Sequence, residues 1–240
     1  MNQNLYSFFW LLVGLALGFS VGYVGTTALN QSQEAVQSTA SRLPEGHPDI
    51  SNQVDVEKEV RAAIEFGRQN LDYESQLRVG SFLYMEAQRL EEAKPFFLKA
   101  HELRPNEFEP LRQLGNVTFD LSQHKNDPEL MKEAAKWYEK ALKIKPDDIN
   151  VRTDYGITFF LRQPPDYRSA IAQYDKSLQI NPEHAPTLYN KLRAQIALGE
   201  ITEALTTFEK LKSASPEQQE LIRHAQAELE NAKGNKIPTH

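Results

Sequence analysis

The chain has 240 residues, a formal net charge of −6 and 40% hydrophobic residues, which is enough apolar material for a core. This moderate negative charge argues against a general nucleic-acid binder, because such proteins gather positive charge. Cysteine is absent, which excludes disulfides, a thiol nucleophile and cysteine-ligated metals.

An apolar stretch from Leu5 to Leu29 predicts a single membrane-spanning helix. No charged side chain precedes Glu34, and about 25 helical residues reach roughly 37 Å, more than the roughly 30 Å of hydrocarbon in a bilayer. We therefore predict a transmembrane anchor over residues 1–30. The alternative is a cleaved signal peptide, which the missing basic amino-terminal region and the length of the apolar run disfavour.

Gly14, Gly18 and Gly22 repeat every four residues within this segment and would form one stripe on a helix. Small residues at this spacing let two membrane helices approach closely, which predicts packing against a second copy or a partner anchor. The alternative is that the glycines have no such role, since glycine is common in membrane helices. Arg42 alone gives little charge information on orientation, and we expect the domain that follows to be periplasmic.

A polar region separates this segment from the rest of the chain. Residues 31–53 are rich in Gln, Ser, Thr and small side chains and contain two prolines, so they predict a flexible linker. Apolar residues then recur at helical spacing, and residues 54–71 are expected to form a half repeat that packs on the first full one. A short coiled coil that continues the linker is the alternative.

Four fifteen-residue segments then share one pattern. They are residues 91–105, 132–146, 168–182 and 202–216. In each, the third residue is alanine, the seventh is aromatic and the last is proline. The alanine and the aromatic residue are four apart and share one face of a helix, and proline ends that helix. Successive prolines are 41, 36 and 34 residues apart, so we predict a helical repeat.

A period near 34 residues with helix–turn–helix content resembles the tetratricopeptide repeat (TPR) family. The leucine–glycine and aromatic positions of its first helix are matched by Leu114 and Gly115 in the second repeat, and by Tyr155, Gly156 and Phe159 in the third. The first helices are expected at residues 74–87, 108–121, 149–161 and 185–198. The resemblance implies an all-α fold, a right-handed α–α superhelix of four repeats over residues 72–216. A capping helix at 217–232 and a tail at 233–240 would follow.

The same resemblance implies that the first helices line a concave groove that binds a protein or peptide. The candidate groove residues are Arg78, Phe82, Met85, Arg112, Asn116, Phe119, Thr153, Ile157, Phe160, Tyr189, Arg193 and Ile196. Three arginines among apolar side chains predict a partner with an acidic group. The alternative for part of this set is burial in a curved core. The family's clamp for chaperone tails is not expected, because Asp154 and Pro186 stand where amide and basic groups are needed.

The sequence does not predict a catalytic, cofactor or metal site. No two of the six histidines are four residues apart, and no phosphate-binding glycine loop or nucleophile elbow is present. We therefore expect no enzyme activity, no cofactor and no nucleic-acid partner.

An anchor, a linker and a repeat domain resemble, in layout, bacterial TPR factors for the biogenesis of c-type cytochromes. The expected function is a single-pass membrane scaffold that holds a protein partner while a cell-envelope complex is assembled, such as the machinery of c-type cytochrome maturation. The alternatives are a structural membrane protein that forms homo-oligomers and an accessory subunit of an envelope enzyme complex.

Overall fold

The computed structural model describes residues 56–234, and every regular element within them is helical. The elements in chain order are α3 (Val56–Gln69), α4 (Tyr73–Ser81), the π-helix η2 (Phe82–Glu86), α5 (Leu90–Leu103), α6 (Phe108–Lys125), α7 (Pro128–Ile144), α8 (Ile149–Leu161), α9 (Tyr167–Ile180), α10 (Ala185–Leu198), α11 (Ile201–Ala214) and α12 (Gln219–Gly234). No strand occurs in this range, which confirms the expected all-α fold for these residues.

The predicted anchor, its glycine stripe and the linker up to residue 53 lie outside the described residues, as does the tail from residue 235. Among helices α3 to α12, none has the length and the apolar content needed to cross a bilayer. The anchor, its orientation and the linker therefore stay predictions.

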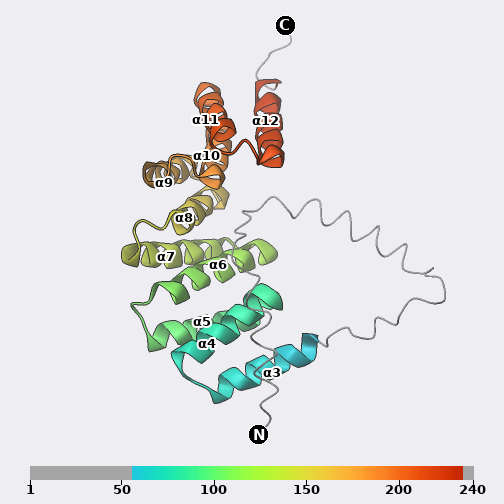
Figure 1. The fold of residues 1–240 in the computed structure, drawn as a ribbon, viewed down its shortest axis with the longest axis vertical. Coiled ribbons are helices and arrows are strands. Elements are labelled where there is room, and N and C mark those ends of the chain that lie inside the picture. The colour runs from blue at the N-terminus through green and yellow to red at the C-terminus, as the bar shows by residue number, and fades with distance from the viewer. Residues whose placement is uncertain (1–55, 235–240) are drawn as a thin grey trace, which may run out of the picture. The chain divides into compact units, whose positions relative to one another are not determined.

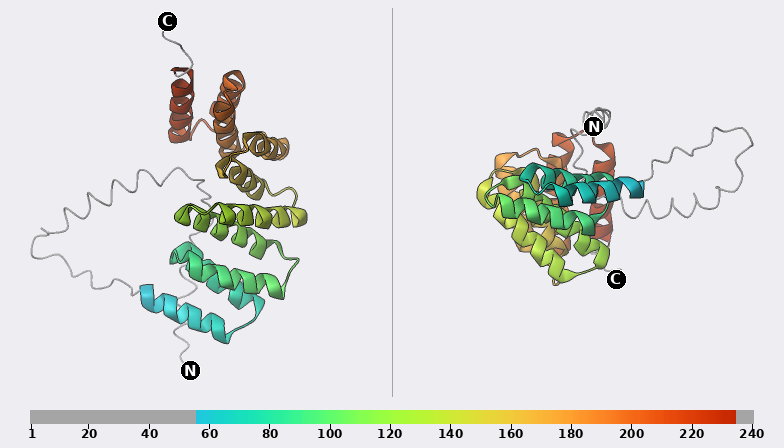
Figure 2. Two further views of the ribbon diagram at one scale, coloured as in Figure 1. Left: turned by 180° about the vertical axis from the view of Figure 1, so that it is seen from behind. Right: turned by 90° about the horizontal axis from the view of Figure 1, so that it is seen from below.

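The helices form hairpins that follow one another along a stack, as Figure 1 shows and the views of Figure 2 repeat. A first helix packs against a second in each hairpin: α4 with η2 against α5, α6 against α7, α8 against α9, and α10 against α11. Each of α5, α7 and α9 also contacts the first helix of the next hairpin. At the two ends of the stack, α3 packs on α4 and η2, and α12 packs on α10 and α11. This is the solenoid that the repeat pattern predicts.

The four repeat prolines mark where the second helices end. Helices α5, α7, α9 and α11 each end two residues before the proline of their segment, which cannot donate the next backbone hydrogen bond. Several helix starts are set by aspartates. Asp127, Asp148 and Asp166 accept hydrogen bonds from backbone N–H groups in the first turns of α7, α8 and α9. Helix bounds therefore follow largely from local signals.

The shared alanine and aromatic positions form the contact between the two helices of each hairpin. Ala134 and Tyr138 of α7 are almost completely buried. A Cβ on Gly115 of α6 would lie only 2.4 Å from a carbon of the Tyr138 ring, and a Cβ on Gly156 of α8 would lie equally close to Tyr174. Glycine is required at both positions because the tyrosine ring lies directly against the backbone of the first helix.

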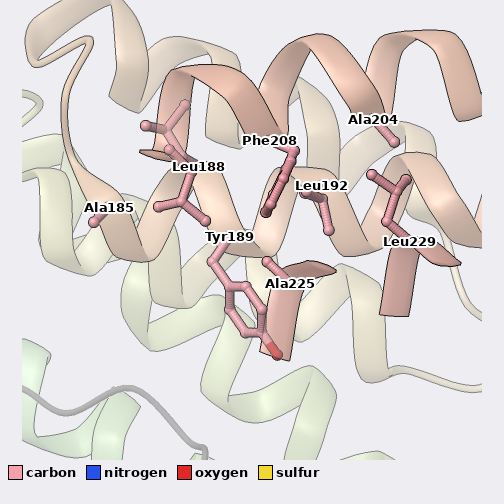
Figure 3. Close-up of a cluster of buried hydrophobic side chains, with 9 residues drawn as sticks. Ala185, Leu188, Tyr189, Leu192, Ala204, Phe208, Ala225 and Leu229 are labelled. Atoms are coloured by element: carbon pink, nitrogen blue, oxygen red, sulfur yellow. The ribbon is translucent and has the colours of Figure 1, made fainter. Parts of the chain in front are cut away.

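The C-terminal helix closes the last repeat. Figure 3 shows Ala225 and Leu229 of α12 beside Leu192 of α10 and Phe208 of α11. These side chains belong to one buried cluster, in which Leu192 is 0% exposed and Leu229 is 2% exposed. A solenoid end without such a helix would expose this apolar surface, so α12 covers the last hairpin.

Candidate interaction surface

Polar side chains from neighbouring helices form hydrogen bonds to α6. The Tyr84 hydroxyl of η2 donates a hydrogen bond of 2.7 Å to Asp120 Oδ2 of α6. The Tyr138 hydroxyl of α7 donates one of 2.9 Å to Asn116 Oδ1 of α6. Burial is the main cause that raises the pKa of both tyrosines, and the charge of Asp154 on α8 adds to the rise.

We call this set the central polar cluster. It consists of Tyr84, Arg112, Asn116, Asp120, Tyr138, Asp154 and Tyr174. The side of the stack formed by α4 with η2, α6, α8 and α10 is the first-helix face.

Glycine in the first helix explains how second-helix side chains reach this face. The Tyr138 ring lies against Gly115, and its hydroxyl meets the side chain of Asn116, the next residue of α6. Tyr174 lies against Gly156 of α8 in the same way. The contact between glycine and tyrosine that lets the two helices approach therefore also brings the tyrosine hydroxyl from the second helix to the first.

Asp154 is the most perturbed acidic group of the cluster. The residue is half-buried, and loss of water around its carboxyl group raises the pKa of Asp154 to about 7. The charge of Arg112 lowers this pKa, whereas the charges of Asp148 and Asp120 raise it further. Burial also raises the pKa of Asp120. Within residues 56–234, Asp154 accepts no hydrogen bond and forms no ion pair. Its carboxyl group is therefore a poorly hydrated acid without an ion pair in that range, and the charge of Arg112 offsets its own only in part.

Tyr174 is a second side chain of the cluster that lacks a partner. The residue is 0% exposed, and its hydroxyl makes no hydrogen bond within the described part of the chain. Burial raises its pKa, and the charged groups that act on the hydroxyl are Arg193 and Asp154. Buried hydroxyls without a partner are uncommon in folded proteins, so this group calls for an explanation.

The arginines that the sequence suggested as an acid-binding set already have partners. Arg112 donates to both carboxylate oxygens of Glu109, at 3.1 and 2.5 Å. The Arg193 Nε lies 3.4 Å from Glu228 Oε2 of α12. The Arg78 guanidinium lies 5.4 Å from the centre of the Phe66 ring. The structure therefore differs from the expected cationic groove, because the two arginines on α6 and α10 are paired with carboxylates.

Two predicted groove residues lie in the packed interior instead. Thr153 is 3% exposed, and its hydroxyl is 2.6 Å from that of Thr187 on α10. Tyr189 is 7% exposed and donates a hydrogen bond of 3.0 Å to Glu228. Both side chains stabilise contacts between helices, so they do not offer a free surface.

Most of the other predicted groove residues either belong to the central polar cluster or pack against the hydrophobic core. Asn116 and Arg112 belong to the central polar cluster, and Met85 is 60% exposed. Five apolar residues of the set are partly buried against the core clusters: Phe82, Phe119, Ile157, Phe160 and Ile196.

Sequence reasoning missed five members of the cluster as site residues. They are Tyr84, Asp120, Tyr138, Asp154 and Tyr174. One available signal was the tyrosine at the seventh place of the second and third segments, where the first and fourth have phenylalanine. A buried tyrosine hydroxyl normally needs a hydrogen-bond partner, which predicts polar groups opposite it.

A separate pocket of about 940 Å³ lies between α9, α10 and α11. Its walls include the ion pair of Lys191 and Asp175, with 2.6 Å between Nζ and Oδ1. No member of the central polar cluster lines this pocket. In the part of the chain from residue 56 to 234, no group of three or more acidic or histidine side chains is placed to hold a metal ion.

Comparison with known proteins identifies the repeat. Two family models, both described as tetratricopeptide repeat, match residues 161–229 in one case and residues 74–107 and 129–148 in the other. No curated protein sequence matches the chain.

Solved structures share the fold at low sequence identity. A crystal structure of MamA is 18% identical with a TM-score of 0.59, and the match covers 69% of this chain and 92% of that one. MamA from Desulfovibrio magneticus RS-1 is 19% identical with a TM-score of 0.58, covering 79% and 94%. A thermophilic TPR protein of Thermus thermophilus is 12% identical with a TM-score of 0.57, covering 84% and 96%.

The family models together match just over half of the chain, and the stacked hairpins have the architecture of these solved structures. Such a fold is suited to protein–protein interaction. The chain belongs to the tetratricopeptide repeat family.

Proposed function

We propose that this protein is a membrane-tethered scaffold that binds a partner protein on its first-helix face while a cell-envelope complex is assembled. The observation that carries the proposal is the central polar cluster. Tyr174 is buried there and Asp154 half-buried, and neither has a hydrogen-bond partner among the described residues. A bound partner can pair with the half-buried carboxyl group of Asp154, whose charge also acts on the buried Tyr174 hydroxyl.

The tether in this proposal is the apolar segment at residues 5–29, which has the length of a membrane span. The c-type cytochrome machinery is one envelope complex that such a scaffold could serve, and the layout of anchor, linker and repeats supports it. Alkaline extraction of membranes tests the tether: the full chain should stay in the pellet, and a chain without residues 1–30 should be released. Release of both chains would contradict it.

Site-specific photocrosslinking in intact cells tests the interaction. A photoreactive amino acid replaces Asn116 in the central polar cluster, and the matched control replaces Glu203, which is exposed on the second helix α11. We expect adducts to a different protein from position 116 and few from position 203. Equal adducts at both positions would refute a dedicated face. Adducts only to a second copy of the chain would favour the homo-oligomer instead.

A further inference from the structure

We propose that the central polar cluster receives a cationic side chain, a lysine or an arginine, from the partner protein. This inference rests on the proposed function and names the chemistry that the partner must bring. It reverses the expectation of an acidic partner that the arginines suggested in the sequence.

The first argument is the balance of charge. Asp120 and Asp154 belong to the cluster, and its one basic residue, Arg112, is held by both oxygens of Glu109. Neither aspartate forms an ion pair within the described residues, so Arg112 and His124 offset their negative charge only in part. A cation placed between or beside them lowers the cost of keeping them charged away from water.

The second argument is the direction of the hydrogen bonds. The hydroxyl protons of Tyr84 and Tyr138 are donated to Asp120 and Asn116, so these two phenol oxygens have only acceptor capacity left. Asp120 accepts one bond from Tyr84 and has further acceptor capacity. Lysine and arginine side chains carry several donors and no acceptor, which is what a cluster dominated by acceptors requires.

The third argument is the unpartnered hydroxyl of Tyr174. It is fully buried, and Asp154 is one of the two charged groups that act on it. This observation is independent of the acidic pair and points to the same place. It is one of several buried polar atoms without a partner in the described chain, and among the members of the central polar cluster it is the one hydroxyl that makes no hydrogen bond.

An acidic partner fits the same surface poorly. At this cluster it would have to displace Glu109 from Arg112 before it gained a charged contact of its own. It would also approach the two aspartates and meet repulsion between like charges.

The test selects ligands without assuming a sequence. The full-length protein in a mild detergent is used to select peptides of about twelve residues from a random displayed library. The same selection is run on Asp154→Asn, which keeps the shape of the side chain, and on Glu203→Gln, an exposed carboxylate on α11 that serves as the charge control. Circular dichroism and melting curves establish that each variant is folded.

The strongest peptide then enters a double-mutant cycle. We expect the wild type and Glu203→Gln to select peptides with a fixed lysine or arginine. Changing that residue to glutamine should weaken binding to the wild type by about ten- to a hundredfold, and binding to Asp154→Asn by less than about threefold.

Each other outcome overturns the inference in a distinguishable way. Selected peptides without a fixed basic residue, or basic peptides that bind Asp154→Asn equally well, refute the cationic site and leave a peptide-binding function in place. A protein that selects no peptide refutes both.

Discussion

Replacing Asp154 by asparagine should stabilise the protein, and the gain should depend on pH in a defined way. The carboxyl group is held where burial raises its pKa from the ordinary 3.8 to about 7. An unfolded chain releases this proton near pH 4, whereas the folded chain keeps it until about pH 7. Between these values the unfolded state binds fewer protons, so the stability of the wild type falls as pH rises.

The magnitude follows from the same values. The free-energy difference is about 1.4 kcal/mol for each tenfold change in proton affinity, which gives a total penalty of about 4 kcal/mol above pH 7. Between about pH 4.5 and about pH 8, the advantage of Asp154→Asn over the wild type should grow by about 3 kcal/mol. The asparagine amide also lacks an assigned partner, which costs about 1–2 kcal/mol at every pH and so shifts the whole curve without changing its slope.

Urea unfolding followed by circular dichroism measures this difference at a series of pH values on the full-length protein, with Glu203→Gln as the control. The charged and titratable groups around Asp154 are Asp148 at the N-terminal cap of its helix, Arg112 and Asp120 on α6, Tyr84 on η2, Tyr138 on α7 and Tyr174 on α9. None of these phenols should titrate in the range used, because burial raises their pKa values. A difference between variant and wild type that stays constant with pH would refute the assignment of a poorly hydrated acid.

Three further predictions address packing and helix ends. Gly115→Ala places a Cβ 2.4 Å from the Tyr138 ring and should lower the free energy of unfolding by about 1–2 kcal/mol. The control Gly234→Ala, whose Cβ has no atom within 4 Å, should leave the stability unchanged, and thermal melts compare the two variants. Asp166→Ala removes an acceptor for the Ser169 N–H and hydroxyl and should lower the free energy of unfolding in urea by about 1 kcal/mol. Since these bonds lower the pKa of Asp166, the greater stability of the wild type should disappear as pH falls below about 4. Leu229→Ala opens the cluster under α12 and should cost about 2–4 kcal/mol, with faster hydrogen exchange in α12 than in α6; equal exchange in both would contradict this.

Local signals account for most of the agreement between predicted and observed helices. A proline such as Pro146 or Pro182 ends its helix through its own chemistry, whatever the surrounding fold. An alanine four residues before an aromatic side chain defines which face of the helix is buried, so Ala134 and Tyr138 could be placed correctly without coordinates.

Charge pairing between distant helices could not be predicted in the same way. The pairing of Arg112 with Glu109 spans one helical turn and was readable from the sequence, but that of Arg193 with Glu228 joins α10 to α12. Tyr84 lies in a π-helical segment, and the family spacing does not fix where its hydroxyl points. These contacts depend on how the hairpins stack, and the one between α10 and α12 pairs a groove arginine with a carboxylate.

The same contacts predict where along the stack the proposed partner binds. Helix α12 covers the apolar end of the last repeat through Ala225 and Leu229, and its Glu228 binds the Tyr189 hydroxyl and the Arg193 guanidinium. One helix therefore satisfies both the apolar and the polar side chains at that end of the first-helix face. The cluster residues without a hydrogen-bond partner in the described range, Asp154 and Tyr174, lie further toward the N-terminus, on α8 and α9. A partner that pairs with these groups should therefore contact the first three hairpins, whereas α12 already covers the fourth.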